Sequence, residues 1–189
     1  MSQTKTLAYS QQLKVVATLV GALTLLELVN LLTGRFLNQF GVVPRDLFSL
    51  PGILFGPLLH GNIWHFASNI VPMCIFSFLM LQYGTKRFAL ISAWILLTTG
   101  IMVWLFGRHA THIGLSGLIY GYFGYLLLAG FISHKPRLIV ISLLVAFFYG
   151  GLIWGVLPSG PIVSWESHLF GFLCGLSGAR LFVSKYDYK

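Results

Sequence analysis

The stretch that decides the fold reads His112-Ile113-Gly114-Leu115-Ser116-Gly117-Leu118-Ile119-Tyr120-Gly121. A serine flanked by glycines stands here at the start of an apolar run that continues to about Phe131, and the residues just before the stretch are mostly polar. A serine at such a junction can be a helix cap, a packing residue or a nucleophile. The other polar residues of the chain bear on the choice between these roles.

The composition is that of a membrane protein. Of the 189 residues, 57% are hydrophobic and 8% are charged, whereas charged residues make up about 25% of a soluble domain. The length corresponds to one domain, residues 1–189. The net charge of +8 is scattered between apolar runs, which argues against a nucleic-acid surface, where basic residues cluster among aromatic ones. Cys74 and Cys174 lie inside apolar runs and are expected to be buried thiols.

Six charge-poor runs are long enough to cross a membrane, which takes about 20 residues of helix. They cover residues 13–32, 63–83, 88–106, 115–131, 138–157 and 163–183. We therefore predict an all-α polytopic membrane protein with six transmembrane helices. The connection between the first two runs, residues 33–62, is unusually long, and prolines and glycines interrupt its apolar part. We expect this loop to lie in the membrane interface; the alternative is a plain connector.

The positions of lysine and arginine predict the orientation, because these residues are enriched in cytoplasmic loops. With the N-terminus inside, the cytoplasmic side carries nine of them: Lys5, Lys14, Lys86, Arg87, Lys135, Arg137, Arg180, Lys185 and Lys189. The outer side carries three: Arg35, Arg45 and Arg108. Both termini are therefore expected in the cytoplasm, and the long loop and the approach to Ser116 share the outer face.

The fourth apolar run is short. A helix from Ser116 to Phe131 measures about 24 Å at about 1.5 Å per residue, against a hydrocarbon core of about 30 Å. If its inner end reaches the cytoplasmic surface, Ser116 lies below the outer surface. Irregular backbone at that depth must be buried in protein or line a water-filled cavity. Residues 108–115 are therefore expected to dip into the helix bundle.

Histidines inside the apolar runs are candidates for function, because polar groups in a membrane are costly. His168 shares a helix face with Gly171 and Gly175, and the run after Ser116 also has a glycine face. Because small residues let helices approach closely, His168 could reach Ser116. A histidine that only bonds across helices for packing is the alternative.

His65 and Asn69 are four residues apart and share a helix face, with His60 in the loop before them. They could donate to a developing oxyanion or simply bond between helices. A metal site is the third option, but these histidines have no carboxylate or thiolate at ligand spacing apart from Glu166. Glu166, two residues before His168, lies on a different helix face and is not assigned as a third catalytic residue.

Three separated motifs carry a resemblance to a known family. They are Gly114-Leu115-Ser116-Gly117, Ser167-His168-Leu169-Phe170-Gly171-Phe172-Leu173-Cys174-Gly175 and His60-Gly61-Asn62-Ile63-Trp64-His65-Phe66-Ala67-Ser68-Asn69. The chain resembles the rhomboid family of intramembrane serine proteases over all six runs, closest to the compact six-span bacterial GlpG type. The motifs are similar to that family's GxSG, AHxxGxxxG and HxxxxHxxxN. Two departures are Ser167, where alanine is usual, and the absence of the family's first-loop Trp-Arg pair from residues 48–58.

The resemblance implies a role for each motif residue. Ser116 corresponds to the nucleophile and His168 to the general base, while His65 and Asn69 correspond to the oxyanion donors. The supporting residues are Tyr120, which would pack on the histidine, together with Gly114, His60, Gly171 and Gly175. The resemblance implies neither a metal nor another cofactor.

The implied reaction is hydrolysis of a peptide bond in the transmembrane helix of another membrane protein, near its outer end, through an acyl-enzyme. Its water would come from a cavity open to the outer face and roofed by residues 158–163. The implied partners are such substrates and the lipid bilayer, and the implied location is the bacterial inner membrane. Two alternatives are a transporter or channel that uses the histidines as a proton relay, and an inactive relative that only binds membrane helices.

Overall fold

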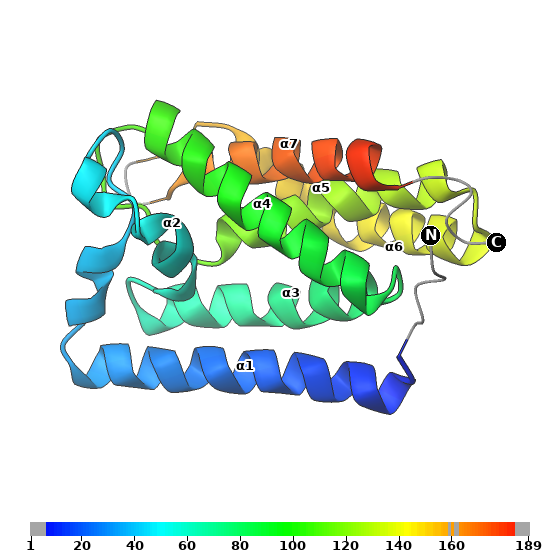
Figure 1. Ribbon diagram of the computed structural model, residues 1–189, viewed down its shortest axis with the longest axis horizontal. Helices are drawn as coiled ribbons and strands as arrows, with labels where there is room; N and C mark the ends of the chain where they lie inside the picture. Colours follow the sequence, from blue (N-terminus) through cyan, green and yellow to red (C-terminus); the bar gives the residue numbers. More distant parts are fainter. Residues whose placement is uncertain (1–6, 159, 161–162, 184–189) are drawn as a thin grey trace.

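The computed structural model describes residues 7–158, 160 and 163–183, and in these residues the chain forms seven α-helices. They are α1 (Tyr9–Leu32), α2 (Gly52–Phe55), α3 (Ile63–Leu81), α4 (Thr85–Phe106), α5 (Ser116–Ser133), α6 (Pro136–Tyr149) and α7 (Trp165–Phe182). Most of the long helices run roughly along one axis, α4 crosses them at a slant, and α1 lies on the outside next to α3 (Figure 1). The beginning of α1 and the end of α7 lie toward one end of this bundle, and the loop that follows α1 lies at the other.

Five of these segments are long and apolar enough to cross a membrane: α1, α3, α4, α5, and α6 together with the 3-10 helix η4 (Gly150–Val156). They confirm the prediction of an all-helical, multi-pass membrane protein in outline. Helix α7 is not among the five. It carries Glu166 and His168 in its first turns and Arg180 in its last, so its composition is more polar than that of the others. The sixth span therefore stays a prediction.

Helix α5 is the centre of the bundle. Buried residues make up 72% of its apolar stretch, against 17–33% for the other four candidate spans. Its principal neighbour is α7, and glycines allow the two backbones to touch. A Cβ atom at Gly171 would overlap the carbonyl oxygen of Gly117, and one at Gly175 would overlap that of Gly121. The glycine faces of α5 and α7 therefore set how closely the two helices pack.

The long connection between α1 and α3 is folded into short helices. It contains η1 (Phe36–Phe40), η2 (Leu47–Ser49), α2 and η3 (Gly56–Leu58). Helix α2 packs against α4, and η3 packs against α5. Gly41 and Gly52 meet closely, since a Cβ at Gly52 would lie 2.5 Å from the carbonyl oxygen of Gly41. The connection is thus fixed against the end of the bundle that holds the start of α5.

Candidate functional site

Ser116 is the first residue of α5 and is half-buried. The N-cap position belongs to Leu115, and no side-chain hydrogen bond caps this helix. Gly114 has φ +112°, a conformation that glycine adopts readily, and its N–H donates to the carbonyl of Gly56 at 2.9 Å. Within the described residues, no hydrogen bond occupies the Ser116 hydroxyl. Among the residues that the structure describes, the serine side chain therefore neither caps the helix nor hydrogen-bonds to a neighbour.

His168 lies one turn into α7 and stacks on Tyr120 of α5. The two ring centroids are 4.1 Å apart and the planes differ by 4°. His168 Nδ1 lies 2.9 Å from the carbonyl oxygen of Gly155 in η4. Because a carbonyl only accepts hydrogen bonds, Nδ1 carries the ring proton and Nε2 keeps its lone pair. Tyr120 follows Ser116 by one turn of the same helix, so His168 stacks on the helix that begins with the serine. Among the described residues, no hydrogen bond joins Ser116 to His168.

His65 lies against the backbone that precedes Ser116. A Cβ atom at Gly114 would lie 2.6 Å from His65 Nε2, so only glycine leaves room for the imidazole there. The N–H of Gly61 points at His65 Nδ1 at 3.4 Å, which assigns the ring proton to Nε2. The Nε2–H of His65 faces the loop that leads into α5, and within the described part of the chain no hydrogen bond occupies it.

Asn69 is one turn further along α3 and buried. Its Nδ2 donates to the main-chain carbonyl of His65 at 2.6 Å. One of its two amide protons is thereby used inside its own helix, and the other is available to a ligand.

His60 is fully buried beside His65, with ring centroids 5.1 Å apart. Its carbonyl oxygen accepts from Arg35 Nη1 at 3.0 Å and from Asn38 Nδ2 at 3.1 Å. Burial, with the nearby charges of His65 and Arg35, lowers the pKa of His60 to about 3. His60 is therefore a neutral residue that fixes the loop before α3, at the place where the long connection returns to the bundle.

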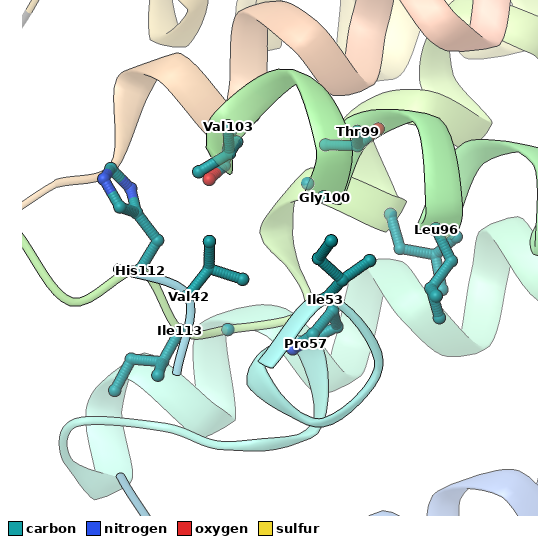
Figure 2. Close-up of a pocket in the computed structure, with 13 residues that line it drawn as sticks. Val42, Ile53, Pro57, Leu96, Thr99, Gly100, Val103, His112 and Ile113 are labelled. Carbon is teal, nitrogen blue, oxygen red and sulfur yellow. The ribbon is translucent and has the colours of Figure 1, made fainter. Parts of the chain in front are cut away.

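A small cavity of about 40 Å³ lies between α4, the long connection and the residues that lead into α5 (Figure 2). Its lining includes Thr99, His112, Gly114, Gly117 and Ser167. The hydroxyl of Thr99 is buried and has no hydrogen-bond partner among the described residues. Because a water needs about 10–15 Å³ of such space and polar partners, the cavity has room for a few water molecules beside Gly114 and Gly117, which flank Ser116 in the chain.

A family model described as the Rhomboid domain matches residues 48–185. The chain belongs to the rhomboid family. Uncharacterised proteins of Mycobacterium bovis and Mycobacterium tuberculosis are each 38% identical to it over 175 residues, which is 88% of this chain and 73% of theirs. One from Mycobacterium leprae is 34% identical over 176 residues, covering 88% of this chain and 69% of its own. Membership of the rhomboid family implies intramembrane serine protease activity in general and a lipid-embedded site.

Two parts of this rhomboid site were not predicted from the sequence. The first is Gly155, which binds His168 through a main-chain carbonyl that no side-chain pattern reveals. The second is the set of contacts around His112, a residue inside the quoted stretch to which no role was assigned. In the sequence, Gly155 is only a glycine between two apolar residues, and His112 is only a polar residue close to the serine.

The predicted roof of the cavity, residues 158–163, includes residues 159, 161 and 162, which lie outside the described residues. Glu166 is buried and pairs with Arg108, with Oε1 3.6 Å from Nε. Its carboxylate thus binds the loop before Ser116, and no hydrogen bond in the described part of the chain joins it to His168.

Proposed function

We propose that this rhomboid is an intramembrane serine endopeptidase of the compact six-span bacterial type, with Ser116 as nucleophile and His168 as general base. One observation carries the proposal. The His168 ring is held by Tyr120 on its face and by Gly155 at Nδ1, which leaves Nε2 as the base on a helix that packs directly against the helix begun by Ser116.

The reaction follows from these positions. Ser116 Oγ attacks the carbonyl carbon of a substrate peptide bond while His168 Nε2 takes its proton. The same nitrogen then protonates the leaving amine, which gives an acyl-enzyme and the first product. A water deprotonated by Nε2 attacks the ester, and Ser116 regains its proton as the second product leaves. The cavity beside Thr99 is the proposed source of this water.

A carboxylate is not needed to orient this histidine. In a serine protease triad the third residue holds the imidazole in the correct tautomer and orientation. Here the carbonyl of Gly155 would fix the tautomer, and the face of Tyr120 would fix the ring plane. We therefore propose a dyad whose supporting residues are a main-chain carbonyl and an aromatic ring.

The oxyanion of the tetrahedral intermediate needs donors that are already in place. We assign this role to the Nε2–H of His65, the second amide N–H of Asn69 and main-chain N–H groups at the start of α5. The proximity of His65 to Gly114 supports the assignment, because the imidazole lies against the residue two positions before the nucleophile. Removing one such donor costs about 100-fold to 1000-fold in rate in serine proteases.

We further propose that α7 is the sixth span, that both termini are cytoplasmic and that the protein resides in the bacterial inner membrane. Helix α7 supports this topology because it lies roughly along the same axis as α1, α3 and α5 and packs on α5, the most buried of the candidate spans. The substrates would be transmembrane helices of other membrane proteins, cut near their outer ends where small or helix-breaking residues allow local unwinding.

Labelling with a fluorophosphonate probe tests the proposal, because the probe reacts with activated serines. The purified wild-type protein should be labelled at Ser116, and Ser116→Ala should abolish the label. His168→Ala should slow labelling by about 100-fold or more, since a positioned general base contributes about 100-fold to 10000-fold. His109→Ala is the matched control, because His109 is an exposed histidine that precedes Ser116 in the same loop. Labelling elsewhere, or at an unchanged rate in His168→Ala, would refute the proposal.

A further inference from the structure

Three segments of the chain meet at His112, which is buried just before the start of α5. Its main chain pairs with Val42 in both directions: the N–H of Val42 donates to the carbonyl of His112 at 3.0 Å, and the N–H of His112 donates to the carbonyl of Val42 at 2.7 Å. These two bonds attach the loop that leads to Ser116 to the long connection after α1. The side chain reaches the third segment, the beginning of α7.

The hydrogen bonds of the His112 side chain have a defined direction. Nε2 lies 3.0 Å from the carbonyl oxygen of Arg108 and must donate to it. In the neutral ring Nδ1 is then an acceptor, so the hydroxyl of Ser164, 2.5 Å away, donates to it. The oxygen of Ser164 in turn accepts from the hydroxyl of Ser167 at 2.7 Å. The chain of bonds ends on the residue next to His168.

Ser164 gives up its usual role to make this contact. It occupies the N-cap position of α7, but its hydroxyl makes no capping bond to that helix. A serine at this position normally caps the helix and stabilises it by about 1 kcal/mol. Here the hydroxyl of Ser164 instead binds His112, in the loop before Ser116. The start of α7 is therefore joined to that loop, and the backbone N–H groups of the first turn receive no side-chain cap.

Arg108 also joins the loop before Ser116 to the start of α7. Arg108 Nη2 donates to the carbonyl of Val163 at 2.6 Å, and Arg108 Nε lies 3.6 Å from Glu166 Oε1. Both contacts cross from the loop to the start of α7. Burial lowers the pKa of His112, which agrees with a neutral ring whose Nδ1 accepts.

We infer that His112 is a positioning residue, which holds residues 107–115 in register with the first turn of α7 so that Ser116 and His168 meet. The inference rests on the proposed protease function. Among the described residues no hydrogen bond joins His112 to Ser116 or to His168; it acts through the Ser164–Ser167 pair on one side and through the loop backbone on the other. Loss of its side chain should slow the attack of Ser116 without weakening the binding of a ligand.

Fluorophosphonate kinetics separate these two effects into the maximal rate of labelling and the probe concentration that gives half of it. His112→Phe keeps the volume but removes both hydrogen bonds, and it should lower the maximal rate about tenfold, the factor expected for about 1.4 kcal/mol, with the half-saturating concentration within about twofold. His112→Asn places an amide oxygen near the Nδ1 position and should restore the rate to within about threefold of wild type. His109→Phe should match wild type.

Variants of Ser164 provide a second test by the same labelling assay, and this test does not depend on whether His112→Phe folds. Ser164→Ala should slow labelling as much as His112→Phe does, and Ser164→Thr, which keeps the hydroxyl, should not. The double variant of His112→Phe and Ser164→Ala should be no slower than either single one, because each single variant already removes the bond between His112 and Ser164 that joins the loop to α7. Three results would overturn the inference. They are a double variant in which the two losses of labelling rate multiply, equal losses in His112→Asn and His112→Phe, and a wild-type rate in Ser164→Ala. Absence of labelling at Ser116 in the wild type would instead overturn the proposed function.

Discussion

Replacing Gly155 by alanine perturbs the support of His168 without touching a catalytic side chain. A Cβ atom at Gly155 would overlap the hydroxyl oxygen of Tyr120 and lie 2.9 Å from Cζ of the same ring. Carbon atoms in contact are about 3.5–4.0 Å apart, so ring and backbone must separate by at least about 0.6–1.1 Å to relieve the contact with Cζ alone. The Gly155 carbonyl that binds His168 Nδ1 and the ring that stacks on it would then move apart. A misplacement of about 1 Å costs about 100-fold in rate, and we predict that loss in the maximal rate of fluorophosphonate labelling at Ser116.

The same 3-10 helix supplies the control for this variant. A Cβ atom at Gly151 would have no atom within 4 Å, so Gly151→Ala makes the same change of backbone entropy without the overlap. It should label at the wild-type rate. Adding Tyr120→Phe to Gly155→Ala removes the overlapping oxygen and should recover about tenfold of the loss. A wild-type rate in Gly155→Ala, or an equal loss in Gly151→Ala, would refute the assignment of Gly155 as the partner of His168.

Two further predictions concern stability. Gly171→Ala should lower the unfolding temperature in detergent, because its Cβ would overlap the Gly117 carbonyl and such overpacking costs about 1–3 kcal/mol. Gly21→Ala is the control and should leave the unfolding temperature unchanged, because its Cβ would have no atom within 4 Å. Equal changes in the two variants would contradict the backbone contact between α5 and α7. His60 should make the wild type less stable as pH falls from about 6.5 to about 3, because its folded pKa is near 3 and the unfolded chain takes up the proton first, at about 1.4 kcal/mol per pH unit. His60→Gln should reduce the pH dependence of the unfolding free energy in this range relative to wild type, while a substitution at exposed His109 should leave it unaltered. An unchanged slope in His60→Gln would contradict the burial of His60.

The helical fold was predictable because each long helix is encoded by its own apolar run. The start of α5 is an example: glycines and polar residues precede Ser116, and the apolar run after it is the most buried helix of the bundle. The family was predictable from three motifs that lie on different helices, and the Rhomboid domain match confirms it. The sixth span and the roles of Ser116 and His168 stay predictions, since neither hydropathy nor a family match tests them.

The contacts that support the site were not predictable, for two physical reasons. Gly155 acts through its carbonyl, and a main-chain group has no sequence signature. His112 acts through Ser164, which lies 52 positions further along the chain, and the two become neighbours only when α7 packs against α5. The ion pair between Glu27 and Arg35, at 2.6 Å, was equally hidden, because an acidic residue inside an apolar run gives no information about its partner.

Cleavage of a membrane-spanning reporter tests the central claim most directly. The purified protein would be reconstituted into liposomes with a single transmembrane helix that carries small, helix-breaking residues near one end. The products would be identified by mass spectrometry for the wild type, Ser116→Ala and His168→Ala. A protease built on Ser116 and His168 cuts the wild-type sample at a defined bond near that end, and neither variant cuts. Cleavage that persists in Ser116→Ala, or a wild-type sample that labels at Ser116 but leaves every such helix intact, would contradict it.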